Sequence, residues 1–298
     1  MITELIICTK DRPDEVSRCL KSVITQSEAP VRVIIVDSSR NESTRRVSED
    51  AKSDMTTEVV YLSCEPGLTH QRNVGLNKVL ESTDIVHFVD DDTVLEPDYV
   101  AAMNEAFLMW PNAVGGTGFI TNLPNHKLRF WRRLALSDGP DGAVLKSGIN
   151  LLNFGGKCGR EVDWLSGCSM SYRVRMLDGL RFDERRTGNG LGEDVDFSLR
   201  ASARGDLFWT PHARLAHIQS PINREAAFRV ARRNVHHRWL LAEDGVDPVR
   251  KWAIVYSVLA SAVAGTILAV LTASRYRLRM ELASLLGLGD VLTRRARY

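Results

Sequence analysis

The chain has 298 residues, of which 44% are hydrophobic and 26% are charged, and its formal net charge is +2 at pH 7. This length allows a sizeable core and favours one large domain with an appendage over two equal domains. A charge this close to neutral does not indicate a nucleic-acid-binding protein, so we expect no nucleic-acid partner.

Cysteine usage and the N-terminal sequence both bear on the cellular compartment. The cysteines, at positions 8, 19, 64, 158 and 168, are odd in number and show no C-x-x-C spacing. This pattern is typical of reduced thiols in a cytosolic protein. Met1 to Glu4 leads directly into an apolar run, without a basic region and an apolar signal segment. We therefore expect the catalytic part in the cytoplasm.

Strands alternate with helices through residues 1–92. Short apolar runs rich in β-branched residues predict buried strands, and apolar residues at helical spacing after Pro13 predict a helix. The expected strands are 5–8, 31–36, 59–62 and 85–89, with helices over 13–24, over 41–54 and from Thr69 as its cap. Thr9, Asp37 and Asp90 end three strands on one edge of the predicted parallel sheet. Residues 1–92 are thus predicted to form a nucleotide-binding α/β half.

Residues 93–220 are expected to complete the same domain as an acceptor half. Pro97 opens a predicted helix to about Trp110, and a glycine-rich strand follows over 113–120. The segment 121–160 lacks clear periodicity, and such long segments are more often functional than idle. Helices are predicted near 174–177 and from Gly192, and strands over 207–209 and 215–218. Residues 1–220 are therefore predicted to form one catalytic domain, with a Rossmann-like mixed sheet flanked by helices.

Three consecutive acids, Asp90, Asp91 and Asp92, follow the apolar strand 85–89. In an extended backbone alternate side chains point the same way, so Asp90 and Asp92 can share one hard cation. Mg²⁺ or Mn²⁺ bridging to phosphate fits, because such ions usually take only one or two protein carboxylates. A solvated loop of acids is the alternative, and the buried strand directly before them argues against it.

Several further motifs occur in a fixed order along the chain. They are Ile7-Cys8-Thr9-Lys10-Asp11-Arg12-Pro13, Val36-Asp37-Ser38-Ser39, Arg72-Asn73-Val74-Gly75, Trp164-Leu165-Ser166-Gly167 and Glu193-Asp194. Together with Asp90-Asp91-Asp92, they resemble the motifs of family 2 glycosyltransferases, inverting sugar-nucleotide enzymes with the type A glycosyltransferase fold. The resemblance covers roughly residues 3 to 220 and is specific for the family, but not for a substrate.

The resemblance implies a role for each matching residue. The catalytic base would be Asp194, and Asp92 and His217 would bind Mn²⁺ or Mg²⁺. The donor would bind at Thr9, Asp37, Arg72, Asp90 and Asp91. The acceptor would bind near Trp164, Gly167 and Glu193. Simple structural roles remain as alternatives, with Asp194 as a helix cap and His217 as a buried core histidine. The donor would be a nucleoside diphosphate sugar, with a UDP-sugar favoured, and the acceptor a hydroxyl of a glycan, a lipid-linked glycan or a protein. The expected context is glycan or cell-surface polysaccharide assembly.

Two rival functions fit parts of the pattern. Asp90-Asp91-Asp92-Thr93-Val94 also fits the D-x-D-x-V motif of haloacid-dehalogenase-like phosphohydrolases, in which Asp90 would be a nucleophile. That motif normally ends the first strand of its fold, whereas here it ends the fourth. An inactive membrane-bound scaffold is the other rival, and the presence of Asp90, Asp92 and Asp194 argues against it.

Residues 221–298 are predicted to form a basic and apolar helical region. The segment Arg224 to Trp239 is rich in arginine and histidine, which indicates either nucleic acid or, as favoured here, a helix on anionic lipid. Trp252 to Ser274 carries no charge and would be about 34 Å long as a helix, enough to cross a bilayer core. Flanking arginines on both sides leave a span and an in-plane position equally open. A soluble helix packed on the catalytic domain or in a homo-oligomer interface is the alternative to attachment at the cytoplasmic face of a membrane.

Overall fold

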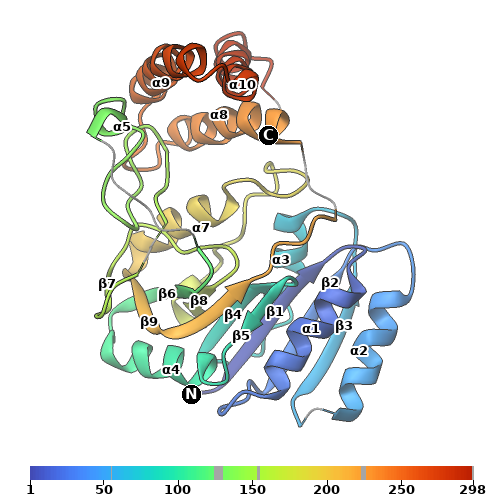
Figure 1. The fold of residues 1–298 in the computed structure, drawn as a ribbon. Coiled ribbons are helices and arrows are strands. Elements are labelled where there is room, and N and C mark those ends of the chain that lie inside the picture. The colour runs from blue at the N-terminus through green and yellow to red at the C-terminus, as the bar shows by residue number, and fades with distance from the viewer. Residues whose placement is uncertain (55, 124–129, 153–154, 223–225, 297–298) are drawn as a thin grey trace.

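The computed structural model describes residues 1–54, 56–123, 130–152, 155–222 and 226–296. Figure 1 shows a lower part built on one sheet and an upper layer of helices formed by the end of the chain. Arg224 of the predicted basic segment lies outside the described residues.

The first half of the chain forms a parallel sheet, as predicted. Its strands are β1 (Thr3–Thr9), β2 (Arg32–Asp37), β3 (Glu58–Ser63) and β4 (Ile85–Asp90), joined by α1 (Pro13–Ile24), α2 (Ser43–Asp54) and α3 (Leu68–Leu76). Strand β1 pairs in parallel with both β2 and β4, with Thr9 opposite Asp37 and Cys8 opposite Asp90. The polar residues that end these strands therefore lie along one edge of the sheet.

The second half of the chain extends this sheet with antiparallel and parallel strands. It contributes β5 (Thr93–Leu95), β6 (Ala113–Ile120), β7 (Arg160–Glu161), β8 (Met170–Arg173) and β9 (Asp206–His217), and the strand order is β3-β2-β1-β4-β8-β6-β9-β5, with β7 on β9. The sheet is mixed because β8 runs antiparallel to β4 and to β6. The predicted strands 207–209 and 215–218 are two parts of the single strand β9, whose register against β6 shifts between Thr117 and Phe119. This irregularity, with Pro211 inside the strand, interrupts the apolar run that marks a strand in the sequence.

Helices cover both faces of the sheet. One core joins β1 to α1, α2 and α4 (Tyr99–Met109), and the opposite core joins it to α3, α6 (Val174–Leu177) and α7 (Glu193–Ala201). Alternation along β1 assigns Leu5 and Ile7 to the first core and Ile6 to the second. A short helix, α5 (Phe130–Leu134), and the 3₁₀ turn Ser202–Arg204 complete this part of the fold. Helix α3 begins at Leu68 after Gly67, and Thr69 does not cap it but donates its hydroxyl to the Arg186 carbonyl.

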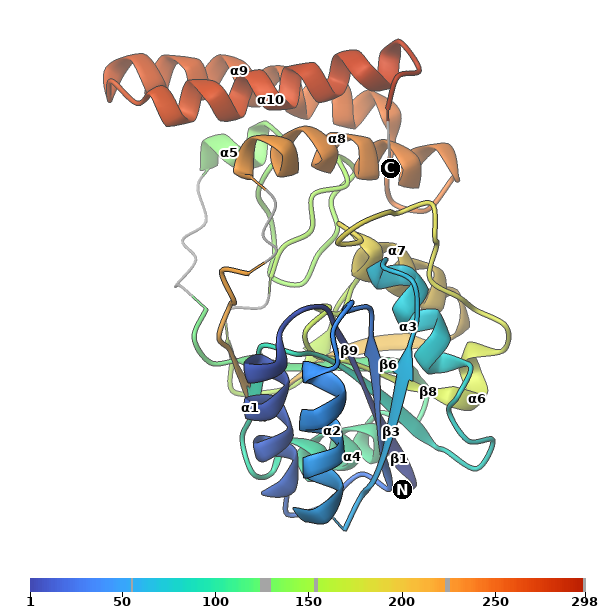
Figure 2. The ribbon, with the colours of Figure 1, turned by 90° about the vertical axis from the view of Figure 1, so that its right-hand side faces the viewer.

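The last part of the chain forms α8 (Ala227–Glu243), α9 (Lys251–Leu271) and α10 (Arg275–Leu292). Figure 2 shows α9 and α10 side by side across the top of the molecule, with α8 between them and the catalytic part. Gly287 permits the close approach of α10 to α8, since a Cβ there would lie 2.4 Å from the Arg232 carbonyl oxygen. The predicted helix on anionic lipid is therefore an inner helix, and residues 235–241 of α8 are all buried.

Candidate active site

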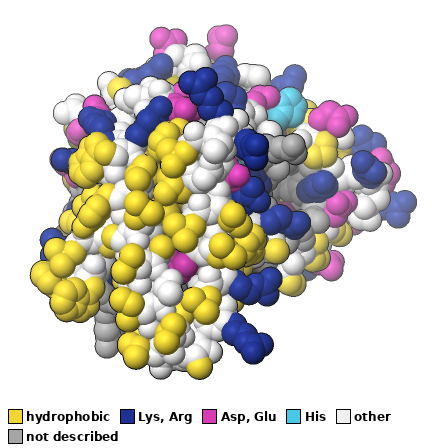
Figure 3. All heavy atoms as spheres, turned by 90° about the horizontal axis from the view of Figure 1, so that it is seen from above, with side chains coloured by type: hydrophobic (Ala, Val, Ile, Leu, Met, Phe, Trp, Pro, Cys, Tyr) yellow, Lys and Arg dark blue, Asp and Glu magenta, His cyan; other side chains and the backbone are white. Residues whose placement is uncertain are grey.

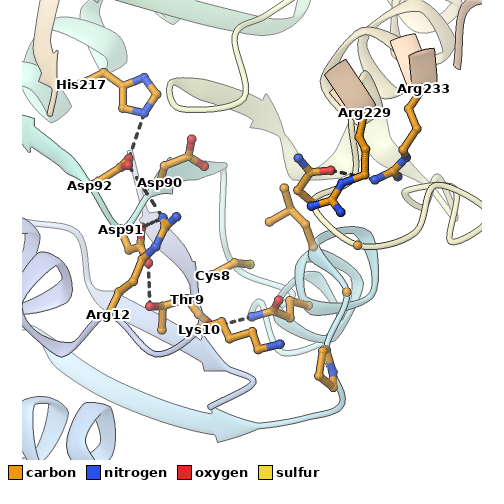
Figure 4. Close-up of a pocket in the computed structure, with 16 residues that line it drawn as sticks. Cys8, Thr9, Lys10, Arg12, Asp90, Asp91, Asp92, His217, Arg229 and Arg233 are labelled. Carbon is orange, nitrogen blue, oxygen red and sulfur yellow. Dashed lines mark hydrogen bonds and ion pairs between the residues drawn. The ribbon is translucent and has the colours of Figure 1, made fainter. Parts of the chain in front are cut away.

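A pocket of about 590 Å³ opens at the carboxyl ends of β1 and β4. Figure 4 shows Asp90, Asp92 and His217 on one side of it and Arg229 and Arg233 of α8 on the other. The pocket lies where ligands gather in open α/β sheets, beyond the strand ends where neighbouring connections diverge. Its remaining lining includes Cys8, Thr9, Lys10, Arg12, Pro66, Gly67, Leu68, Gln71, Asp91, Gly188 and Asn189.

Asp90, Asp92 and His217 form a cluster that fits a divalent cation. One ligand atom from each of the three lies within 4.8 Å of the others. His217 ends β9 opposite Thr93 of β5, and its Nε2 lies 2.9 Å from Asp92 Oδ1. Asp92 Oδ2 also accepts a hydrogen bond of 2.8 Å from the Ser220 backbone N–H, which fixes the carboxylate. Two carboxylates and one imidazole are a donor set that suits Mn²⁺, and Mg²⁺ through the carboxylates.

The charges within this cluster are strongly coupled. Burial alone would lower the pKa of His217, but the hydrogen bond with Asp92 raises it to about 11. Burial would likewise raise the pKa of Asp92, but the hydrogen bonds from His217 and Ser220 keep it below its usual value. His217 and Asp92 therefore form a charged pair in the metal-free protein, and a metal ion would replace the imidazole proton.

Asp91 has a different environment from its two neighbours. It is 3% exposed, accepts a hydrogen bond of 2.7 Å from the Thr9 hydroxyl, and lies 3.0 Å from Arg12 Nη1. Burial raises the pKa of Asp91 to about 6, although the contacts with Thr9 and Arg12 act in the opposite direction. The alternation predicted for the three acids agrees with this geometry, because Asp91 holds the β1 turn while Asp90 and Asp92 form the cluster.

Arg72 joins the two halves of the site. The side chain from α3 is buried, and its Nη2 lies 3.2 Å from Asp90 Oδ1 and donates 3.0 Å to the Gly167 carbonyl. Its Nη1 lies 2.5 Å from Glu193 Oε2 at the start of α7. Burial raises the pKa of Glu193, and the attraction of Arg72 opposes this shift and favours the carboxylate. Arg72 thus connects the end of β4 to the acids that open α7.

Asp194 follows Glu193 in the first turn of α7 and contacts the segment that carries Gly167. Its Oδ2 accepts a hydrogen bond of 3.0 Å from the Gly167 N–H, and its Oδ1 accepts one of 2.9 Å from Val195 N–H. Burial raises the pKa of Asp194 above the usual value for an aspartate, although Arg72 and both N–H donors lower it. A carboxylate with a raised pKa is a stronger base than one in water.

Three predicted site residues have roles that the geometry limits. Asp37 is fully buried, and its oxygens accept hydrogen bonds from Ser39 and from the Tyr61 hydroxyl, so it shapes the end of β2. Trp164 is 3% exposed, and its indole N–H donates to the Leu151 carbonyl. Glu193 is 5% exposed and paired with Arg72. In this structure the three residues are buried and bonded to other parts of the protein. Their direct contacts with a donor or an acceptor stay predictions.

Some residues that line the pocket or contact its acids had no part in the site predicted from the sequence. Arg12 follows the β1 turn, Gln71 precedes Arg72 and donates to the Thr9 carbonyl, and Ser220 follows β9. Arg229 and Arg233 line the far side, although the sequence suggested lipid contact for their segment. Their spacing of four residues on α8 predicts a shared helix face, but only the tertiary packing directs that face into the pocket.

The chain belongs to glycosyl transferase family 2, whose family model matches residues 4–161, more than half of the chain. The resemblance of its motifs to this family is therefore confirmed. A phosphohydrolase is not favoured, because the acidic strand end lies within the matched region of a transferase.

Curated relatives support the same class. The chain is 30% identical over 122 residues to a glucosyl-dolichyl phosphate glucuronosyltransferase of Haloferax volcanii, covering 39% of this chain and 38% of that protein. It is 32% identical over 87 residues to the glycosyltransferase GlyA of Streptococcus pneumoniae, covering 29% of this chain and 12% of that protein. A longer match, 25% identical over 259 residues, covers 83% of this chain and 78% of the succinoglycan biosynthesis protein ExoM of Rhizobium meliloti. The chain thus spans less than half of the length of the first two relatives.

Solved structures show the fold. The mannosyltransferase PcManGT from Pyrobaculum calidifontis, in complex with GDP-Man and Mn²⁺, superposes with a TM-score of 0.61 at 16% identity, covering 97% of this chain and 86% of that one. S. aureus TarS 1-349 in complex with UDP gives a TM-score of 0.54 at 15% identity, covering 98% and 92%. The mixed sheet flanked by helices is therefore the type A glycosyltransferase fold, as predicted.

Proposed function

We propose that the protein is a metal-dependent, inverting glycosyltransferase that moves a sugar from a nucleoside diphosphate donor to a hydroxyl acceptor. The observation that carries this proposal is the cluster of Asp90, Asp92 and His217 beside the pocket, connected through Arg72 to the acids of α7. Donor binding and proton removal need these two sets of groups on opposite sides of one reacting carbon.

The donor side of the site is built for a diphosphate. Asp90, Asp92 and His217 would hold Mn²⁺ or Mg²⁺ through carboxylate and imidazole atoms that are already close together. A bound divalent cation would neutralise the charge that gathers on the departing diphosphate, without proton transfer. Thr9 and Asp91 hold the β1 turn that borders the same pocket, and Arg229 and Arg233 add positive charge across it.

Asp194 is the proposed catalytic base. A carboxylate that faces the anomeric carbon opposite the leaving group takes the proton of the acceptor hydroxyl as the new C–O bond forms. Attack from that side inverts the anomeric configuration in a single displacement. The raised pKa of Asp194 supports this role, and its hydrogen bond from Gly167 N–H fixes the carboxylate next to the predicted acceptor segment.

The donor and the biological context follow from the relatives as proposals. Among the solved structures of similar fold, one holds UDP and another holds GDP-Man with Mn²⁺. We propose that the donor of this protein is a UDP-sugar. The match to a succinoglycan biosynthesis protein supports a role in polysaccharide assembly. The acceptor is proposed to be a hydroxyl group of a glycan, with a lipid-linked glycan as the leading class.

Attachment to the cytoplasmic face of a membrane completes the proposal. Helix α9 is long and apolar enough to cross a bilayer. The mean hydropathy of its most apolar 18 residues is 2.2, and 28% of these residues are buried in the protein. Helix α9 packs against α10 along its length. We propose that the α9–α10 layer lies in the plane of the membrane surface.

Thermal stability in the presence of nucleoside diphosphate sugars tests the donor assignment. We expect a UDP-sugar to raise the melting temperature with Mn²⁺ and much less without it, because a ligand stabilises the state that binds it. Transfer to a hydroxyl acceptor, with the product configuration read by NMR, tests inversion. Retention of configuration, or equal donor binding in the presence of a chelator, would contradict the proposal.

A further inference from the structure

A second cavity, of about 670 Å³, lies between α5, α8, α9 and α10, and α8 separates it from the active-site pocket. Much of its wall is apolar, including Trp131, Val258, Ala264, Ile267, Leu268 and Leu271. It borders the outer face of the α9–α10 layer, where Figure 3 shows hydrophobic side chains gathered, with Lys and Arg along the margins. An apolar hollow next to such a face suits a hydrocarbon chain.

A buried arginine lies at the inner side of this cavity. Arg238 of α8 is 8% exposed, and burial lowers the pKa of its guanidinium to about 10. Its hydrogen bonds reach two backbone carbonyl oxygens, those of Asn234 at 3.4 Å and Ser147 at 3.3 Å. Among the described residues, no carboxylate lies within ion-pair distance of Arg238. A buried cation without a counter-ion is unfavourable, and an anionic ligand would compensate it.

Other polar groups accompany Arg238 in the wall. The Ser137 hydroxyl bonds to the hydroxyls of Ser257 and Ser261, at 3.1 Å and 3.0 Å. The remaining charged lining residues are Arg132 of α5 and Glu281 of α10, and burial raises the pKa of Glu281. Hydroxyl donors and a guanidinium at the inner side can recognise phosphate oxygens, whereas the exposed end of α9 offers apolar side chains such as Ile267, Leu268 and Leu271.

The cavity thus has a polar inner side and an apolar outer side. Leu271 is 77% exposed at the outer side, while Arg238 is almost completely covered at the inner side. Helix α8 also connects the two hollows, because Arg233 lines the active-site pocket and the next residue, Asn234, lines the cavity. A ligand with a charged head and a long tail would place its head next to the wall shared with the active site.

We propose that this cavity binds a phosphate-bearing lipid, with the phosphate on Arg238 and the alkyl chain directed past α9 towards the apolar face. The site would hold the lipid end of an acceptor. In that role it rests on the glycosyl transfer proposed above, whereas lipid binding itself can be measured without any transfer.

Calorimetric titration of the full chain with dodecyl phosphate, below its micelle concentration, tests the proposal. Dodecanol and inorganic phosphate are the matched probes, because each carries one half of the ligand. Ala264 lines the cavity at an exposed position, so Ala264→Trp places an indole in the space that the ligand would occupy. Thr266→Trp is the matched control, because it adds the same indole at an exposed position of α9 outside the cavity. Arg238→Met removes the buried charge and keeps a similar apolar volume.

We expect dodecyl phosphate to bind at least tenfold more tightly than either partial probe. Ala264→Trp should weaken this binding at least tenfold and Thr266→Trp less than twofold, while Arg238→Met should remove the preference over dodecanol. Equal binding by the two Trp variants, or tight binding of inorganic phosphate alone, would overturn the proposal. The Mn²⁺-dependent thermal shift with UDP, measured on the same samples, reports on the donor site alone. A loss of lipid binding can therefore be distinguished from a failure of the proposed glycosyl transfer.

Discussion

Arg72 and Glu193 form a buried ion pair, with 2.5 Å between Nη1 and Oε2, that joins α3 to the first residue of α7. The same guanidinium lies 3.2 Å from Asp90, so one side chain contacts both the proposed metal-ligand cluster and Glu193 of α7. The relative position of the proposed metal site and the proposed base therefore depends on this arginine.

Replacing Arg72 should destabilise the fold as well as the site. Arg72→Met leaves the buried carboxylate of Glu193 unpaired, and breaking a buried pair in this way costs about 3–5 kcal/mol. The double variant Arg72→Met with Glu193→Gln removes both charges and should recover most of that loss. Urea unfolding measures both variants, and equal destabilisation of the two would contradict a coupled pair.

Asp92→Asn should impair metal binding. The substitution removes the charge of one proposed ligand and its pair with His217. We expect the affinity for Mn²⁺ to fall by at least about tenfold, because substitutions of residues that only contact metal ligands already cause losses of this order. Calorimetry with Mn²⁺ and UDP measures the change. Asp50→Asn is the matched control, because Asp50 is an exposed acid on α2 far from the cluster. The ligand assignment does not hold if both variants bind Mn²⁺ as the unaltered protein does.

The pH dependence of turnover should report the raised pKa of Asp194. The proposed base accepts a proton only when it is ionised, so kcat should fall as the pH drops through this pKa, at a higher pH than an exposed aspartate would give. Asp194→Asn should lower kcat by about 10²–10⁴-fold. Binding of UDP with Mn²⁺ should stay the same in that variant. A variant that retains turnover would exclude Asp194 as the base.

Gly167→Ala should disturb the junction between donor and acceptor groups. An added Cβ would lie 3.1 Å from Glu193 Oε1 and 3.3 Å from both Arg72 Nη2 and Asp194 Oδ2. We expect kcat/KM to fall by about tenfold, as small displacements of catalytic groups cost this much or more. Gly289→Ala is the control, since no atom lies within 4 Å of a Cβ there and the helical position should gain up to about 1 kcal/mol. Equal activity of the two variants would argue that this contact is unimportant.

Binding to anionic vesicles tests the orientation of the α9–α10 layer. Leu271→Asp places a charge on the proposed membrane face, where Leu271 is 77% exposed, and should reduce co-sedimentation with vesicles containing phosphatidylglycerol. Leu108→Asp is the matched control, because Leu108 is 72% exposed on α4, at the opposite end of the molecule. If neither variant changes sedimentation, the membrane surface lies elsewhere or is absent.

Local patterns in the sequence predicted the elements that carry strong periodicity. The apolar runs of β1, β2 and β4 end one residue before the observed strands do, and the polar last residues of these strands, such as Thr9 and Asp90, lie at one edge. The bent strand β9 was predicted as two pieces, because Pro211 and a register shift interrupt its apolar run. The short strands β5 and β7 have too few residues for a periodic signal.

The candidate site depended more on tertiary packing. The acids of the cluster could be predicted because three carboxylates end a buried strand, but the contacts of Arg72 with Asp90 and Glu193 join residues far apart in the sequence. Sequence also could not place α8, since its basic residues suit a lipid surface as well as an inner helix that lines a pocket. The stretch from Val235 to Leu241 is buried because it packs against α10, and the sequence of α8 alone does not indicate this packing.

Helix α8 has contacts in two directions, with consequences for regulation. On one side Arg233 donates to the Thr187 carbonyl beside the active-site pocket, and on the other Arg232 and His236 both bind Asp290 of α10. Helix α8 therefore connects α10 to the wall of the pocket. If adsorption to a bilayer changes affinity for the sugar nucleotide, thermodynamic linkage requires the nucleotide to change adsorption by the same factor.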